Sequence, residues 1–271
     1  MRLIMRKKLS LFNLQNLKQA VGEFAVKSGY FVIKLGISMA FKWDLPRKKY
    51  FQIALQRNWD FPKFYEILGE KIDSKTIIVI VGAHHGETAI QYLDSISESI
   101  VVAFEPNLIS FEIAQVRLER YGDRVKLINK SVGSEFGHAT LWHYADSATD
   151  SIRRLQNEEA LGKSHSVLTS LDSEDTINFP KIHLLQIDVQ GYEMEVIKGM
   201  SRHLAEKRIE TILIEGNFED FYSEQSSFWE IAHELSKTHK FLGFASVKFA
   251  ERIKPDLMWV DALFIRRDLL T

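Results

Sequence analysis

The feature that most constrains the fold is an unbroken run of β-branched residues, Thr76 to Val81, that ends at Gly82. A run of this kind, without an alternating polar face, predicts a strand that is buried on both sides. Strands buried on both sides are typical of parallel sheets covered by helices. We therefore expect an α/β protein.

Strand and helix patterns alternate along the rest of the chain. Further strands are expected at residues 100–104, 125–128, 182–187, 211–214, 241–247 and 259–265. Helices are expected at residues 87–93, 108–121, 193–204 and 228–235. Repeated βα units predict a mostly parallel sheet, and the last two strands, with no long helix between them, predict one antiparallel edge strand. The polar residues 146–166 are expected to form a loop or lid with a short helix.

The N-terminal part has a different character. Residues 1–49 carry eleven basic and two acidic side chains, a net charge of +9, whereas the remainder carries −10. Apolar residues at three- and four-residue steps predict a helix in this part. We expect a basic helical extension over residues 1–70, followed by one domain over residues 71–271. The extension is expected to pack on protein, including a second copy as a homodimer; a peripheral membrane contact is the alternative.

Composition excludes several classes of protein. The chain has no Cys, which excludes disulfides, thiolate zinc sites, iron–sulfur clusters and a cysteine nucleophile. The most apolar stretch, residues 24–43, contains three lysines and falls short of the ~18 apolar residues of a membrane span. The basic first ten residues lack the pattern of a cleaved signal peptide. We expect a cytoplasmic protein, with membrane association through the basic helix left open.

Two strand ends indicate a nucleoside cofactor. A glycine such as Gly82 permits a tight turn at the N-terminus of the next helix, where ligands approach the backbone. A dinucleotide motif beginning there would need glycine where His84 and Glu87 stand. Glu105, at the end of the second strand, is placed to bind the hydroxyls of a ribose. A ribose site without a pyrophosphate site indicates S-adenosylmethionine.

The fourth predicted strand leads into Asp188, and Gly191 follows at the next turn. Ligands bind at the carboxyl ends of strands in such sheets. A carboxylate at Asp188 could orient an acceptor, assist its deprotonation or hold a cation. The competing interpretation is that Asp188 caps the following helix.

Several of these segments resemble one known family. They are residues 76–86, 102–107, 167–172, 184–199, 211–215 and 261–265, of which the Ile-Asp-Val-x-Gly-x-Glu block within 184–199 is the most specific. Together they resemble the FkbM family of S-adenosylmethionine-dependent methyltransferases. The resemblance covers about residues 70–267 and implies a class I, Rossmann-like methyltransferase domain.

The resemblance also implies an activity and a site. The implied reaction is O-methylation of a sugar, glycan or natural-product hydroxyl, so the expected partner is such an acceptor and not a nucleic acid. The implied cofactor-binding residues are Gly82, Ala83, His84, Gly86, Glu105, Pro106, Asn107, Ser131 and Asp188. The first candidate for a catalytic residue is Asp188, and Glu193, Glu215 and His85 are the further candidates.

Three positions depart from the family pattern. Ile80, Gln186 and Gln190 stand where the family usually has charged residues. These changes imply either a different acceptor or weakened cofactor binding, and the second case would make the chain a scaffold or partner subunit. A nucleic-acid methyltransferase is a further alternative, although the sequence lacks an RNA-binding module and the Asn-Pro-Pro-aromatic motif of base methylation.

A metal site is not expected. His84, His85 and Glu87 are close in sequence, but neighbouring histidines on one turn cannot easily bind the same ion.

Overall fold

The computed structural model describes residues 76–249 and 257–270. The predicted N-terminal extension and its boundary near residue 70 lie outside these residues. Within the described part, no helix combines the length and the apolar character that a membrane span requires.

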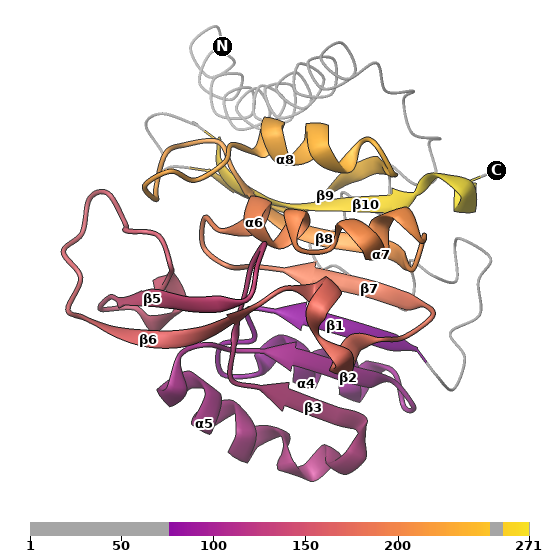
Figure 1. Ribbon diagram of the computed structural model, residues 1–271, viewed down its shortest axis with the longest axis horizontal. Coiled ribbons are helices and arrows are strands. Elements are labelled where there is room, and N and C mark those ends of the chain that lie inside the picture. Colours follow the sequence, from indigo (N-terminus) through magenta and orange to yellow (C-terminus); the bar gives the residue numbers. More distant parts are fainter. Residues whose placement is uncertain (1–75, 250–256, 271) are drawn as a thin grey trace, which may run out of the picture. The chain divides into compact units, whose positions relative to one another are not determined.

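A seven-stranded sheet forms the centre of the described domain (Figure 1), with the strand order β3-β2-β1-β7-β8-β10-β9. Its strands are β1 (Ile77–Val81), β2 (Ile100–Phe104), β3 (Val125–Ile128), β7 (Ile182–Ile187), β8 (Ile209–Asn217), β9 (His239–Phe249) and β10 (Leu257–Arg266). All five residues of β1 are buried, as the β-branched run predicts. β1 pairs in parallel with β2 and β7. The strands β2 and β3 lie on one side of β1, and the later strands of the sheet lie on its other side.

The antiparallel strand lies one place inside the edge. β10 pairs antiparallel with both β8 and β9, and β9 forms the edge of the sheet. The sequence predicts an antiparallel strand at the edge because a hairpin-like pair closes the chain. In the structure, the strand that follows β8 along the chain is β9, and it lies at the edge of the sheet. The last strand, β10, then lies between β8 and β9.

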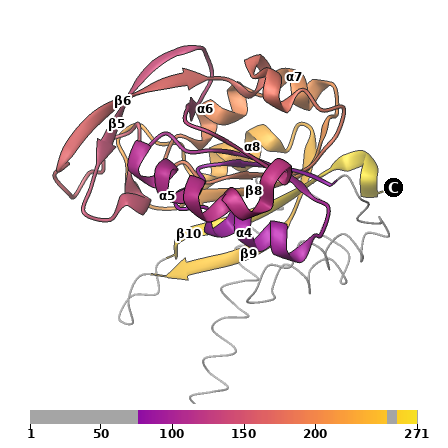
Figure 2. The same ribbon diagram turned by 90° about the horizontal axis from the view of Figure 1, so that it is seen from below.

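Helices cover both faces of the sheet (Figure 2). α4 (Glu87–Ser95) and α5 (Leu108–Leu118) lie on one face, and α6 (Glu193–Lys198), α7 (Ser201–Ala205) and α8 (Phe228–Leu235) lie on the other. The single helix predicted over residues 193–204 is wrong, because α6 ends at Lys198 with Gly199 as its C-cap, and α7 begins at Ser201. A Cβ on Gly199 would lie 1.9 Å from the carbonyl oxygen of Gly133, so this close contact requires glycine.

A second, three-stranded sheet lies beyond the carboxyl ends of the central strands (Figure 1). It contains β4 (Ser131–Val132), β5 (Gly137–His143) and β6 (Gly162–Thr169), in the order β4-β6-β5. The predicted loop over residues 146–166 is therefore wrong at its end, although it does contain the short 3-10 helix η2 (Ser147–Thr149). The alternation of β5 is weak because only Ala139 and Leu141 are buried on it.

Candidate functional site

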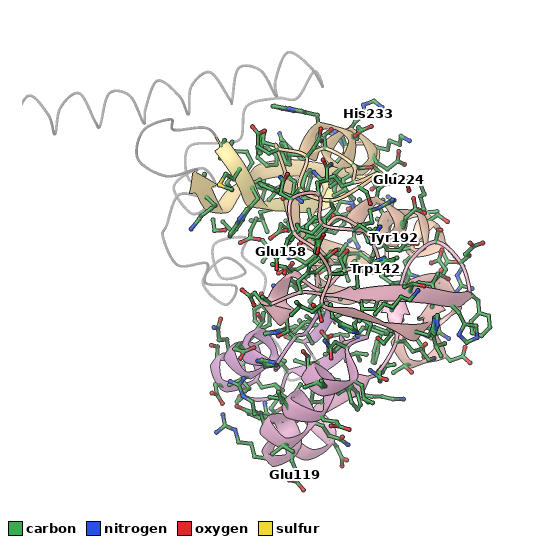
Figure 3. All side chains as sticks on the ribbon, turned by 90° about the vertical axis from the view of Figure 1, so that its left-hand side faces the viewer. Glu119, Trp142, Glu158, Tyr192, Glu224 and His233 are labelled. Carbon is green, nitrogen blue, oxygen red and sulfur yellow. The ribbon has the colours of Figure 1, made fainter. Side chains whose placement is uncertain are left out.

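A cleft opens where the carboxyl ends of β1, β2 and β7 meet the second sheet. Its walls come from the β1–α4 turn, the end of β2, the start of β4, the η2 loop and the end of β7. It encloses about 970 Å³ including its open mouth. Figure 3 looks onto this end of the sheet, with Trp142 of β5 and Tyr192 labelled near its middle.

Glu105 is held at one end of the cleft by two backbone groups. Its Oε2 accepts the N–H of His84 at 2.7 Å, and its Oε1 accepts the N–H of Asn107 at 2.9 Å. The side chain is 6% exposed. Burial, with Asp150 and Asp188 nearby, raises the pKa of Glu105 to about 7. Each carboxylate oxygen keeps a lone pair, so the group can still accept two hydrogen bonds from a ligand.

The loop after β5 closes against this carboxylate through a network that the sequence did not reveal. Asn107 caps α5 with its Oδ1 and donates from Nδ2 to Asp150 at 2.5 Å. The same Asp150 oxygen lies 2.7 Å from Nδ1 of His143, whose Nε2 lies 2.9 Å from Oγ of Ser164. Asp150 thereby ties the η2 loop to both β5 and α5. Only the small polar residues of this stretch could have signalled such a network, and they are equally typical of a solvated loop.

His84 lies where the β1–α4 turn meets the η2 loop. Its backbone has a positive φ of 48°, and its Nε2 lies 2.9 Å from Oγ of Ser147. Its ring stacks on that of His85 with the centroids 3.7 Å apart. Burial and the neighbouring His85 lower the pKa of His84, so the ring is neutral near pH 7.

Ligand atoms of His84, His85 and Glu87 come within 4.8 Å of one another, as a metal site would require. Arg117, however, forms an ion pair with Glu87 and donates to the carbonyl oxygen of His85 at 2.9 Å. A metal ion would have to displace this guanidinium. The expectation that no metal binds here stays a prediction.

Gly82 and Gly86 shape the turn in different ways. A Cβ on Gly82, whose φ is +91°, would lie 1.8 Å from the carbonyl oxygen of Asp188. This contact joins the ends of β1 and β7 and forms the floor of the cleft. Gly86, with φ +82°, is the N-cap of α4 and packs against Leu118 of α5, so it stands behind the cleft.

Asp188 leaves β7 at the opposite end of the cleft. Its Oδ1 accepts Nε2 of Gln190 at 2.6 Å, and Oε1 of Gln190 in turn accepts the hydroxyl of Tyr222 at 2.8 Å. Burial and the charge of Asp261 raise the pKa of Asp188 to about 6, and the Gln190 amide opposes this. Asp188 makes no cap hydrogen bond to α6, whose N-cap is Tyr192. The capping interpretation of Asp188 is therefore wrong.

Two more carboxylates lie behind Asp188. Glu193, 1% exposed, accepts the N–H groups of Val189 and Gly191 at 3.3 and 3.0 Å, and it thereby stabilises the turn into α6. Burial raises its pKa to about 7. Glu215 on β8, 8% exposed, accepts Nε2 of Gln190 at 3.4 Å, and burial raises its pKa well above the usual range. Neither residue lines the cleft, so Asp188 is the one of these three carboxylates that faces it.

The three positions that depart from the family pattern have separate environments. Ile80 is fully buried in the hydrophobic core beneath α4, together with Tyr92 and Leu93, and does not line the cleft. Gln186 accepts the hydroxyl of Tyr92 at 2.9 Å. Both residues serve the interface between the sheet and α4, whereas Gln190 belongs to the Asp188 site.

Seven of the nine predicted cofactor residues line the cleft: Gly82, Ala83, His84, Glu105, Pro106, Ser131 and Asp188. Gly86 and Asn107 stand behind it and hold its walls. Of the candidate catalytic residues, only Asp188 lines the cleft. The side chain of His85 is 29% exposed and stacks on the outside of His84.

Ser131 gives a direct sign that the cleft takes a polar ligand. It is 2% exposed and lines the cleft, and its Oγ has no hydrogen-bond partner in the described structure. Its N–H donates to Oγ of Ser166 at 3.1 Å. Buried hydroxyls are normally paired, and a ligand in the cleft would supply the missing partner.

Residues 81–244 match the model of the Methyltransferase FkbM domain. No curated protein matches the sequence significantly.

The solved structures that match this chain include three methyltransferases. TrmK of M. capricolum, in complex with S-adenosyl-homocysteine, is 14% identical with a TM-score of 0.40, and the match covers 74% of this chain and 67% of that chain. An rRNA methylase from Streptococcus thermophilus is 13% identical with a TM-score of 0.40, covering 74% and 93%. Precorrin-6y C5,15-methyltransferase from Geobacter metallireducens is 12% identical with a TM-score of 0.38, covering 75% and 85%.

Proposed function

Because the chain belongs to the FkbM family of methyltransferases, whose methyl donor is S-adenosylmethionine, we propose that it methylates a hydroxyl oxygen of a sugar, glycan or natural product. The match runs from the last residue of β1 into β9, and it includes every residue that lines the cleft.

The observation that supports the cofactor in this proposal is the way in which the carboxylate of Glu105 is held. Two backbone N–H groups fix its carboxylate at the end of β2 and leave one lone pair on each oxygen facing the cleft. Two neighbouring hydroxyls of a ribose supply two donors at such a spacing. The unpaired Oγ of Ser131 lies on the adjacent wall, toward the end where the nucleobase would lie. The residues present therefore fit the cofactor.

The chain's own residues have three tasks in the reaction. S-adenosylmethionine supplies an electrophilic methyl group when it is bound. Glu105 and the β1–α4 turn fix the cofactor, which makes transfer a matter of aligning the acceptor oxygen. Asp188 can accept the acceptor's proton, because its Oδ1 is tied to Gln190 while Oδ2 has no described partner. The η2 loop, held by Asp150, forms the wall of the cleft beside His84 and Glu105.

Transfer of a labelled methyl group from S-adenosylmethionine tests the proposal. Mass spectrometry of glycans and glycolipids from producing cells, with and without the gene, would identify a product that is heavier by one methyl group. The proposal expects label in an ether linkage that resists mild base. Label in an ester or on a base nitrogen would contradict O-methylation of a hydroxyl.

Ile80, Gln186 and Gln190 motivate the scaffold alternative, and the same assay tests it. A protein that binds S-adenosylmethionine but transfers no label to any extract would favour a scaffold or partner subunit. Label recovered in RNA would favour the nucleic-acid alternative.

A further inference from the structure

Gln190 stands in the middle of a group of carboxylates. Its Nε2 lies 2.6 Å from Oδ1 of Asp188 and 3.4 Å from Oε1 of Glu215. An amide has one end that donates and one that accepts. Only the donating end can face these two oxygens without repulsion, so the orientation of the Gln190 amide decides whether the cluster is stable.

Tyr222 contacts the amide from the other side. Its hydroxyl lies 2.8 Å from Oε1 of Gln190 and 3.3 Å from the carbonyl oxygen of Thr149 in the η2 loop. Burial raises the pKa of Tyr222, so the hydroxyl keeps its proton, and the shorter of its two contacts is the one to Gln190. Because the oxygens of Asp188 and Glu215 require the amide nitrogen to face them, the amide oxygen is left to accept the Tyr222 hydroxyl, and this bond supports the same orientation.

The backbone around Gln190 is built to hold this contact. Gln190 has a positive φ of 54°. Residues other than glycine rarely adopt such a backbone conformation, and it persists only where the surrounding structure holds it. A Cβ on the next residue, Gly191, would lie 2.8 Å from Cβ of Tyr222. Glycine at this position makes the room that the Tyr222 ring occupies.

We propose that Tyr222 is a positioning residue for Asp188: acting through Gln190, it holds the Asp188 carboxylate ionised, with its second oxygen turned toward the acceptor. This inference rests on the proposed function, because it gives Asp188 the role of proton acceptor. It also gives Gln190 a purpose. A glutamate at that position would place a further negative charge against Asp188 and Glu215.

The charges around Asp188 make such a donor necessary. Four other carboxyl groups repel Asp188 or one another as like charges. They belong to Asp261 of β10, Glu215 of β8, Glu193 of α6 and Glu105 of β2. Within the described residues, no Lys or Arg forms an ion pair with Asp188, and the Gln190 amide is the group that favours its charged form.

Titration of the free protein by NMR tests the proposal without a cofactor or acceptor. The protein is labelled with carbon-13 at the aspartate carboxyls, and Asp188→Asn identifies the Asp188 signal. In Gln190→Met, which keeps the side-chain length but loses the donor, the midpoint of this signal should rise by roughly one to two pH units. Tyr222→Phe should raise it by part of that amount, and Gln190→Glu should raise it further than Gln190→Met.

Coupling between the two residues separates positioning from a general structural effect. The double variant Tyr222→Phe/Gln190→Met should titrate like Gln190→Met alone, because Tyr222 acts only through Gln190. The matched control is Tyr144→Phe, which removes the hydroxyl of another buried tyrosine that accepts the N–H of Leu155 at 2.7 Å. It should leave the midpoint unchanged.

An unchanged midpoint in folded Tyr222→Phe, or an equal shift in Tyr144→Phe, overturns the proposal. If Tyr222→Phe does not fold, an unshifted midpoint in Gln190→Met overturns it instead. Binding of S-adenosylmethionine is measured separately. A protein with the expected shifts that binds no S-adenosylmethionine would refute the proposed function and leave the positioning of Asp188 standing.

Discussion

At the residue scale, Glu105 and Asp188 differ in what holds them. Glu105 is fixed by two backbone N–H groups, and its place at the end of β2 followed directly from the sequence pattern. Asp188 is fixed by side chains, Gln190 and through it Tyr222, which lies 34 residues farther along the chain. Strand patterns predict where a strand ends, but they contain no information on which distant side chain reaches that end.

Asp188→Asn tests the role of the carboxylate. The amide keeps the shape of the side chain, and α6 loses no cap, since Glu193 stabilises the turn before it. We expect turnover to fall about 10²–10⁴-fold, whereas affinity for S-adenosylmethionine should change much less because Glu105 is untouched. Asp94→Asn on the exposed side of α4 is the control. Turnover of Asp188→Asn at the parent rate would mean that Asp188 takes no proton.

At the scale of elements, the sequence predicted the central sheet well and the second sheet poorly. β1, β2 and β7 have apolar runs that are buried on both faces, whereas β3 is a shorter strand that is partly exposed. The bounds of all four agree with the expectation to within a residue. The three strands of the second sheet are short or polar on one face, so their signal is that of a loop. The break between α6 and α7 depends on the contact of Gly199 with Gly133, which is tertiary.

Ile80→Asp tests the finding that β1 buries this position in the core. An aspartate would restore the family residue, but its charge would lie unpaired beneath α4 among apolar side chains. We expect a loss of about 4 kcal/mol or more in the free energy of unfolding, measured by chemical denaturation. Ile80→Val should cost only about 0.5–1.5 kcal/mol. A stable Ile80→Asp protein that binds S-adenosylmethionine more tightly would instead place the side chain at the cofactor.

Gly82→Ala tests the contact between the ends of β1 and β7. The new Cβ would meet the carbonyl oxygen of Asp188, so both stability and cofactor binding should fall. Gly122→Ala is the matched control, since Gly122 also has a positive φ, +53°, but has no atom within 4 Å of the added Cβ. It should cost about 1–3 kcal/mol, from backbone strain alone. Equal losses in the two variants would show that the contact with Asp188 is unimportant.

At the scale of the whole molecule, the buried carboxylates link stability to pH. Burial raises the pKa values of Glu105 and Glu193 to about 7 and that of Asp188 to about 6. A carboxyl whose pKa is higher in the folded state stabilises the fold fully at pH values below its unfolded pKa. That contribution is lost as the pH rises through the folded value. The cluster therefore makes the free protein less stable at alkaline pH.

We expect the melting temperature of the free protein to fall between pH 6.5 and pH 8.5. Buried His239, whose pKa burial lowers to about 4, destabilises the fold only as the pH falls below about 6.5, so it does not act in this interval. Glu193→Gln keeps an oxygen for the N–H groups of Val189 and Gly191 but cannot ionise, so its melting temperature should fall less. Parallel curves for the two proteins would show that Glu193 does not titrate in this range.

Calorimetric titration with S-adenosylmethionine, performed on the unmodified protein and on Glu105→Gln, tests the central claim most directly. We predict that one molecule binds per chain and that Glu105→Gln weakens binding at least tenfold, because both ribose hydroxyls then lose a charged acceptor, a difference of about 1 kcal/mol for each bond. Glu119→Gln on the exposed surface should bind as the unmodified protein does. An unmodified protein that binds no S-adenosylmethionine, or a Glu105→Gln variant with an unchanged dissociation constant, would contradict the assignment of the cleft.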